Sequence, residues 1–331
     1  MADEESAPSC LSPRSYYRTR KKALPRNQGE NSLKKFVLFI LCFSILHLLC
    51  KHLTLDFDDQ DLLPLCPLGS QEDTSHLPTD TPLSTMLDQP YYFFAKGNQA
   101  FVFLSEDGRY VLKLLKPGYP QCHFWGCSLS FAYIPLAKTI YKLCKQDCFQ
   151  AKIHKDIQSY LNAFLCFKEQ SKLEYLHLAK TSHLKTRLRL EDPLHNLRLF
   201  DADSTCFLVQ KRVDPFFPTL ENWIKQGDLD QAKRAIDEVI DLLADRFELG
   251  FVKSTHKFHR NFGFFESHPV QLDIGRLIMM KHSTDQPLTQ TILQGQAEPL
   301  LHWLQKHYPS LSNHLLQKVQ TRVATPKAKE H

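Results

Sequence analysis

The segment from Gly250 to Gly275 constrains the fold of this chain more than any other. In it Asn261 precedes an apolar run, a polar turn follows at Glu266–Pro269, and a second apolar run leads to Asp273-Ile-Gly. Two short apolar runs joined by a polar turn predict a β-hairpin with Asn261 at one end and Asp273 at the other. Because a hairpin folds back on itself, the two side chains are expected to lie close together. Two oxygen ligands at one place suit Mg²⁺, which is usually held by one or two protein oxygens together with phosphate oxygens.

Towards the N-terminus, a run of predicted strands ends in a lysine. Residues 91–104 are rich in aromatic and β-branched side chains and bend at Gly97. The Asp-Gly pair at 107–108 is a strong hairpin signal, and residues 109–116 continue as an apolar strand. The pattern predicts a meander of at most three strands, with Lys113 in the last of them.

Two further elements follow this meander. Apolar residues recur at helical spacing within Phe149–Leu178 and predict a helix there. The segments Leu194–Phe200 and Thr205–Arg212 are predicted to pair as the last two strands of the β-rich half. Residues 213–215, which read Val-Asp-Pro, are expected to link this half to a helical half.

The best-formed helix leads directly into the hairpin segment. Asp228 is its expected N-cap, and Gln231, three residues later, completes a capping box. Gly250 suits the position just after the last helical residue. Further helices are predicted beyond the hairpin.

In their order these elements resemble the protein-kinase superfamily. The Val-Leu-Lys that ends at Lys113 is similar to the superfamily's Val-Ala-Ile-Lys, and Asp273-Ile-Gly is similar to Asp-Phe-Gly, with Ile274 in place of Phe. The resemblance implies an α+β, two-lobed kinase-like fold. Its small β-rich N-lobe would cover residues 90–212, and a reduced helical C-lobe would cover residues 213–323.

The resemblance also implies ATP and Mg²⁺ as cofactors. In the superfamily's pattern, Gly97 would belong to the loop over the phosphates, and Lys113 would position the phosphates. A glutamate of the helix that follows would pair with the lysine; Glu169 is the preferred candidate and Glu174 the alternative. The two hairpin residues with side-chain oxygens would hold the metal.

Two departures from the superfamily's pattern argue against efficient catalysis. The superfamily places an Asp five residues before the metal-binding Asn to accept the hydroxyl proton, and His256 stands at that position before Asn261. His256 is the candidate catalytic residue, since imidazole can accept a proton, but it lacks the orienting negative charge. In the phosphate loop Gly97 is present, whereas Gln99 and Val102 stand where the other glycines are expected.

These departures favour a pseudokinase: a membrane-anchored, kinase-like module that binds or scaffolds a protein partner without turnover. Two alternatives stay open. One is an active, atypical phosphotransferase that depends on Mg²⁺ and ATP. The other is a membrane-tethered structural protein without nucleotide binding, in which the hairpin is an ordinary one.

An uncharged run near the N-terminus predicts a membrane anchor. Phe36–Cys50 contains fifteen residues without a charge and has lysines on both sides. If those lysines extend towards the interfaces, residues 33–55 are long enough for one transmembrane helix, and a cleaved signal peptide is the alternative. Residues 1–35 carry eight Lys and Arg. By the positive-inside rule they predict a cytoplasmic N-terminus and a C-terminal domain across the membrane.

The remaining segments are polar. Residues 1–32 form a basic tail that is expected to be disordered, and residues 56–89 form an acidic linker rich in Pro, Ser and Thr. Residues 324–331 form a second basic tail. The net charge of +5 is mild, so nucleic acid is not an expected partner.

The ten cysteines add one ambiguity. Two close pairs, Cys122 with Cys127 and Cys144 with Cys148, have spacings compatible with zinc binding, with disulfides, or with reduced thiols. The sequence leaves these three states open.

Overall fold

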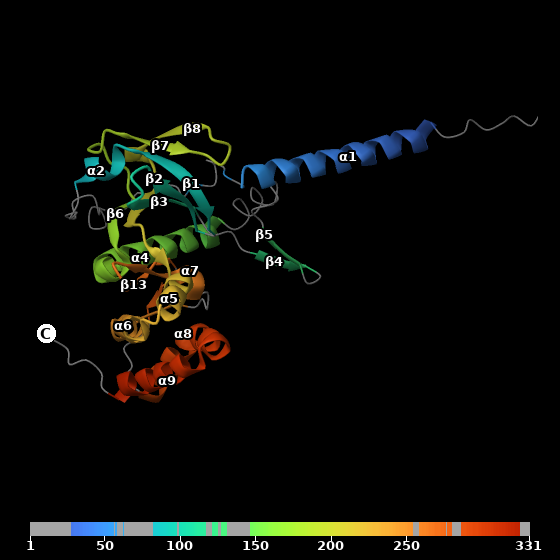
Figure 1. Cartoon of the computed structure of the whole chain (residues 1–331). Coiled ribbons are helices and arrows are strands. Elements are labelled where there is room, and N and C mark those ends of the chain that lie inside the picture. The colour runs from blue at the N-terminus through green and yellow to red at the C-terminus, as the bar shows by residue number, and fades with distance from the viewer. Residues whose placement is uncertain are drawn as a thin grey trace, which may run out of the picture. The chain divides into compact units, whose positions relative to one another are not determined.

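The computed structural model describes residues 28–55, 57, 62, 82–97, 99–116, 121–124, 127–130, 146–253, 258–275, 277–279 and 286–324. The chain divides into two units, residues 1–52 and residues 53–331. In its described part the first unit is one helix, and the second unit contains the sheets and the other helices (Figure 1).

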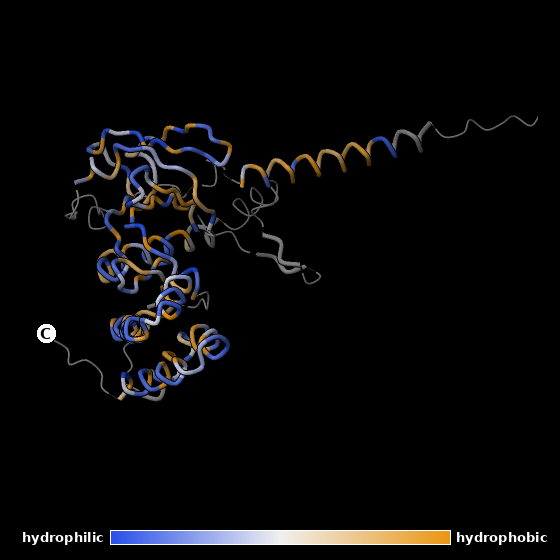
Figure 2. The backbone as a smooth tube through the Cα atoms, viewed as in Figure 1, coloured by the Kyte–Doolittle hydropathy of each residue, from blue (hydrophilic) through white to orange (hydrophobic). Residues whose placement is uncertain are grey.

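Helix α1, Gln28–Leu53, corrects one expectation. Among the described residues, no helix is both long enough and apolar enough to cross a bilayer. The apolar run Phe36–Cys50 (Figure 2) has fifteen residues, whereas a span takes about 20, and the charged Lys34 and Lys35 adjoin it. The expected transmembrane helix over residues 33–55 is therefore wrong, and so is the single-pass localisation inferred from it.

The second unit is built on a seven-stranded mixed sheet. Neighbouring strands are antiparallel, except for β1 and β7, which are parallel. The predicted meander is present as β1–β2–β3, so the sequence places this part of the sheet correctly. In spatial order the strands are β6 (Leu173–His177), β9 (Phe207–Lys211), β3 (Tyr110–Leu115), β2 (Ala100–Ser105), β1 (Pro90–Lys96), β7 (Arg187–Glu191) and β8 (Leu197–Asp201).

Two expectations about this half of the unit are wrong, one on strand pairing and one on the end of a helix. β8 and β9 do not pair: β8 is one edge of the sheet, and β9 lies between β3 and β6. The 3-10 helix η4 (Ala202–Ser204) separates them in the sequence, and the side chain of Asp201 caps it by accepting from Asp203 N. The predicted helix also ends early, because α4 covers Gln146–Ser171 and the next residues form β6, a strand buried at every position.

Each face of the sheet has its own apolar core. One face buries Phe101 and Phe103, and the ring of Phe57 packs edge-on against both. The short helix α2 (Leu83–Leu87) contributes to the same core. The other face packs against α4, where Ile157 and Leu208 are buried. Figure 1 shows α4 between the sheet and the helices of the C-terminal half.

The C-terminal half is helical, with two small sheets beside α4. The described helices are α5 (Phe216–Lys225), α6 (Leu229–Glu248), α7 (Phe258–Asn261), α8 (Gln286–His307) and α9 (Pro309–Ala324). One small sheet contains β10 (Asp214–Pro215), β12 (Phe262–Phe265) and β13 (His268–Gln271). The other pairs β11 (Phe251–Lys253) with β14 (Leu277–Met279). A separate hairpin is formed by β4 (Gln121–Phe124) and β5 (Cys127–Ser130).

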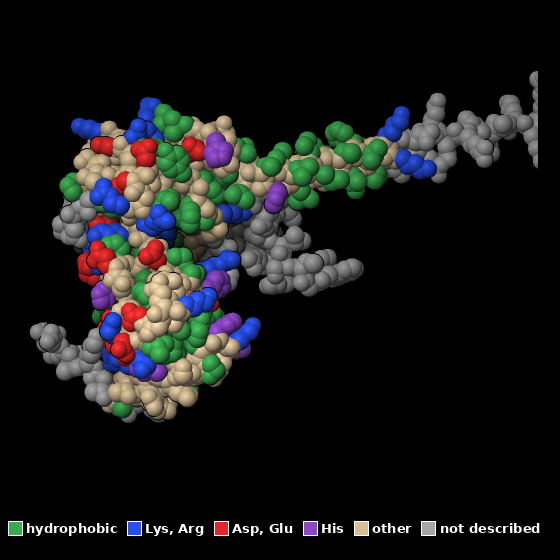
Figure 3. Space-filling model, in the orientation of Figure 1, with side chains coloured by type: hydrophobic (Ala, Val, Ile, Leu, Met, Phe, Trp, Pro, Cys, Tyr) green, Lys and Arg blue, Asp and Glu red, His purple; other side chains and the backbone are tan. Residues whose placement is uncertain are grey.

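Helix α6 is the centre of this half. Its cap is the predicted one, because the Asp228 side chain accepts a hydrogen bond from Gln231 N at 3.0 Å. Gly250 follows the helix with a φ of 84°, a conformation that favours glycine. The apolar face of α6 is buried against α5, α8 and α9. On the surface shown in Figure 3, charged side chains of both signs are interspersed over the folded unit. The fold is α+β.

Candidate functional site

The hairpin β12–β13 brings Asn261 next to the residue before Asp273, as the sequence predicts. Leu272 N donates to Asn261 O at 2.7 Å, so the two ends of the hairpin lie side by side. Residues 266–267 both have positive φ, which is the backbone of a two-residue type I′ turn. The side chain of Asn261 is buried and that of Asp273 is half-buried. The hairpin therefore places the two residues that carry the amide and the carboxylate, Asn261 and Asp273, at the same end.

Lys113 connects the large sheet to this hairpin. Its Nζ donates to Leu272 O at 2.9 Å, and Leu272 immediately precedes Asp273. On the sheet, Lys113 lies between Val102 of β2 and Leu208 of β9, so apolar side chains flank it. Two segments 159 residues apart in the sequence thus meet at one point.

Helix α4 positions the backbone after Asp273. Ser159 Oγ donates to Ile274 O at 3.0 Å and accepts from Leu277 N at 2.8 Å. The Ile274 side chain is buried in the core beneath α4, and Gly275 N donates to Asp273 Oδ1 at 3.3 Å. These contacts hold the chain on both sides of Gly275 and restrict the orientations of the Asp273 carboxylate.

A buried arginine supports the hairpin from the helical half. Arg246 of α6 donates to Gln271 Oε1 at 2.7 Å and to the side chain of Gln296 on α8. Gln271 Nε2 in turn donates to Asp273 O at 3.1 Å. Burial lowers the pKa of Arg246 to about 10, so its guanidinium is still charged at neutral pH. The arginine thereby acts on the backbone of Asp273 through one glutamine.

The other predicted site residues have different surroundings. Gly97 N donates to Ala100 O at 2.9 Å and closes the turn between β1 and β2. Glu169 is exposed near the end of α4 and forms an ion pair with Lys172 at 2.9 Å. His256 lies outside the described residues. The structure therefore brings Lys113 to the hairpin, whereas Glu169 forms a surface ion pair.

Three residues of this region are not predicted by the sequence patterns. Asp156 and Ser159 are both buried on α4, with exposed fractions of 5% and 2%. They lie one turn apart among apolar positions such as Ile153 and Tyr160, so polar residues that interrupt an apolar stripe are the signal that marks them. Arg246 has no such signal, because arginine near the end of an amphipathic helix is usually exposed.

The side-chain oxygens carried by the hairpin residues suit a hard cation. Amide and carboxylate oxygens, as on Asn261 and Asp273, are the ligands that Mg²⁺ takes in proteins. In the described part of the chain, no group of three or more His, Cys, Asp and Glu side chains is placed to hold a metal ion. A cation held here would therefore need further oxygens from phosphate or water. The cysteine pairs, Cys122 with Cys127 and Cys144 with Cys148, have side chains outside the described ones, so the three possible states stay open.

Comparison with known proteins gives distant likenesses among solved structures. No protein-family model matches the chain, and no curated protein does. Among solved structures, the chain is similar to the bifunctional kinase-methyltransferase WbdD, with 13% identity and a TM-score of 0.31 over 72% of this chain. It spans about half of that protein, 48% of its length. The chain thus has a distant structural similarity to a kinase-like protein.

Proposed function

We propose that the second unit is a kinase-like module that binds a nucleotide with Mg²⁺ and does not transfer phosphate efficiently. One observation carries the proposal: Lys113 Nζ donates to Leu272 O at 2.9 Å and so lies beside the Asp273 turn. A lysine from a sheet, a carboxylate and an amide at one point are the groups that phosphoryl-transfer proteins use to hold phosphates and metal.

The surroundings of Lys113 suit the two parts of a nucleotide. Val102 and Val111 are half-buried on the same face of the sheet as Lys113 and offer an apolar surface to a flat base. Lys113 offers a positive charge to the phosphates, and Asn261 and Asp273 offer oxygens to Mg²⁺. When bound, the metal would supply charge neutralisation to the phosphates. The protein's own contribution is the fixed position of these three side chains.

The absence of a suitable base is the reason to propose weak or no turnover. No Asp or Glu occurs between Gly250 and Asn261, and His256 stands where a catalytic aspartate is expected. A neutral imidazole can accept a proton, but it does not stabilise the positive charge that develops on an attacking hydroxyl as a carboxylate does. We therefore propose a binding or scaffold role for a protein partner.

Turnover is tested by incubating the full chain with Mg²⁺-ATP and measuring ADP formation over hours. We expect no ADP above the amount formed with the Asp273→Ala variant, because positioning of phosphates without a base gives little acceleration. The His256→Ala variant is measured beside them. ADP formation by the wild type that is lost in both variants would contradict the proposal and assign an active phosphotransferase.

A further inference from the structure

The side chain of Gln99 lies directly against Gly275. Gln99 belongs to the loop between β1 and β2, whereas Gly275 belongs to the turn that begins at Asp273. A Cβ atom at residue 275 would lie 2.6 Å from Gln99 Oε1 and 2.7 Å from its Nε2. Such distances are too short for a side chain, so the Gln99 amide can lie in this position only because residue 275 is glycine.

The amide nitrogen of Gln99 is shielded from solvent where the side chain meets the turn. Gln99 Nε2 is buried, and within the described residues it has no hydrogen-bond partner. A dry amide nitrogen without an acceptor is unfavourable, so other interactions must hold the loop in place. Lys116 N donates to Gln99 O at 2.9 Å, and Gly97 N donates to Ala100 O at 2.9 Å. These two hydrogen bonds hold the backbone of Gln99 and Ala100 in place.

We infer that Gln99 lowers the nucleotide affinity of the site by occupying space that the phosphates need. The inference rests on the proposed function, in which the phosphates lie near Lys113 and Asp273. Gly275 N donates to Asp273 Oδ1, so the Gln99 amide covers the same turn that carries the metal oxygen. A nucleoside triphosphate can enter the site only when this amide moves away from Gly275. The observed arrangement is the closed form of the site.

The size of the effect follows from the population of the open form. The apparent dissociation constant equals the intrinsic one divided by the fraction of molecules that are open. A site that is open in about 10% of the molecules therefore binds about tenfold more weakly than one that is always open. Glycine at position 99 removes the closing side chain, and it is the residue that the resembled phosphate loop has there.

The test is a calorimetric titration of the full chain with Mg²⁺-ATP, for the wild type and two variants. Gln99→Gly removes the side chain, and Gln99→Leu keeps its size without the amide. We expect Gln99→Gly to bind at least about tenfold more tightly than the wild type, and Gln99→Leu to stay within about twofold of it. Adding Asp273→Ala to Gln99→Gly should abolish the gain in affinity for Mg²⁺-ATP.

The outcomes separate this inference from the proposed function. If the wild type binds Mg²⁺-ATP and Gln99→Gly binds equally well, the occlusion is overturned and the nucleotide site stands. Weaker binding by both variants would show that the amide contacts the phosphates, which also overturns the occlusion. If neither the wild type nor Gln99→Gly binds, while circular dichroism shows both folded, the occlusion and the nucleotide function are both overturned.

Discussion

Arg246 is the residue with the most unusual surroundings near the site. Arg246 is 3% exposed, and among the described residues its hydrogen-bond partners are two glutamines, Gln271 and Gln296, and no carboxylate. A buried charge without an opposite charge is costly, which is why burial lowers the pKa of Arg246. Through Gln271, Arg246 is linked to Asp273 O. We propose that Arg246 positions the backbone of Asp273, whose carboxylate is the proposed metal ligand.

Replacing Arg246 should have two effects: it should lower the stability of the fold, and it should weaken nucleotide binding even under conditions in which the variant is fully folded. Arg246→Met leaves Gln271 Oε1 without a donor in the core, so we expect a loss of about 1–3 kcal/mol in the free energy of unfolding. Because Gln271 is then free to turn away from Asp273, the dissociation constant for Mg²⁺-ATP should also rise. Urea unfolding measures the first effect, and titration well below the unfolding temperature measures the second.

Gln296→Leu is the matched control. It removes a hydrogen bond to the same arginine but leaves the link between Gln271 and Asp273 intact. We expect a similar loss of stability with unchanged nucleotide affinity. If Arg246→Met destabilises the protein and still binds Mg²⁺-ATP as tightly as the wild type, Arg246 is a structural residue and has no positioning role.

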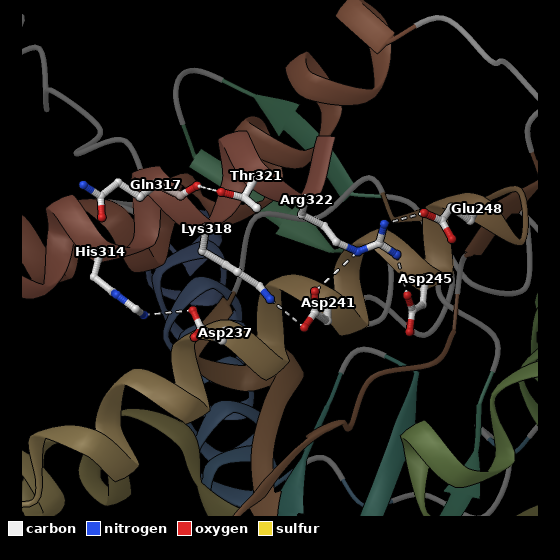
Figure 4. Close-up of polar contacts among 9 residues, drawn as sticks. All are labelled: Asp237, Asp241, Asp245, Glu248, His314, Gln317, Lys318, Thr321 and Arg322. Carbon is white, nitrogen blue, oxygen red and sulfur yellow. Dashed lines mark hydrogen bonds and ion pairs between the residues drawn. The ribbon is translucent and has the colours of Figure 1, made fainter. Parts of the chain in front are cut away.

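At the scale of elements, α6 and α9 are joined by a ladder of charges (Figure 4). His314 and Lys318 of α9 contact Asp237 and Asp241 of α6, each at 2.8 Å. Arg322, one turn further along, lies between three acids, with contacts of 2.7 Å to Asp245 and to Glu248 and 3.4 Å to Asp241. The spacing of four residues on both helices places these groups on facing sides.

Arg322 should dominate the stability of this ladder. Its side chain is 6% exposed, whereas its acidic partners are about a third exposed. Burial opposes its charge, but the hydrogen bonds to Glu248 and Asp245 outweigh burial and raise the pKa of Arg322. Arg322→Met removes two charge-assisted hydrogen bonds, and since water can solvate the freed acids, we expect a loss of about 2 kcal/mol on urea unfolding.

Lys318→Met provides the comparison on the same face. Lys318 is more exposed and contacts one acid, so its removal should cost less than about 1 kcal/mol. The difference between the two variants should shrink little in 0.5 M salt, because the Arg322 side chain itself is only 6% exposed. Equal losses in the free energy of unfolding for both variants would show that the burial of Arg322 adds no stability to these contacts.

For the whole molecule, the sequence predicts the parts of the site that depend on local signals. The hairpin is predicted correctly because a polar turn separates two short apolar runs, and the α6 cap because Asp228 and Gln231 have the spacing of a capping box. The strand that carries Lys113 is also predicted, since the Asp-Gly turn fixes the strand after it.

The sequence fails where partners are distant along the chain. Strand alternation does not encode which strand pairs with which, so the insertion of β7 and β8 beside β1 could not be predicted. Two contacts near the site could not be predicted for the same reason. Gln99 meets Gly275, and Arg246 meets Gln271, and in both pairs the two residues belong to different elements that no local sequence pattern connects. The membrane span predicted over residues 33–55 is also wrong, because its uncharged part, Phe36–Cys50, is shorter than a bilayer crossing.

Lys113, Asn261 and Asp273 are proposed to form one Mg²⁺-dependent nucleotide site. This site is tested most directly by the unfolding temperature of the full chain with Mg²⁺, with ATP, with both and with neither. A ligand at about ten times its dissociation constant adds about 1.4 kcal/mol, which raises the unfolding temperature by a few degrees. We expect this rise in the wild type only when Mg²⁺ and ATP are both present. It should vanish in Asp273→Ala and persist in Asp230→Ala, whose carboxylate lies exposed at the start of α6. No rise in the wild type, or an equal rise in Asp273→Ala, would contradict the account.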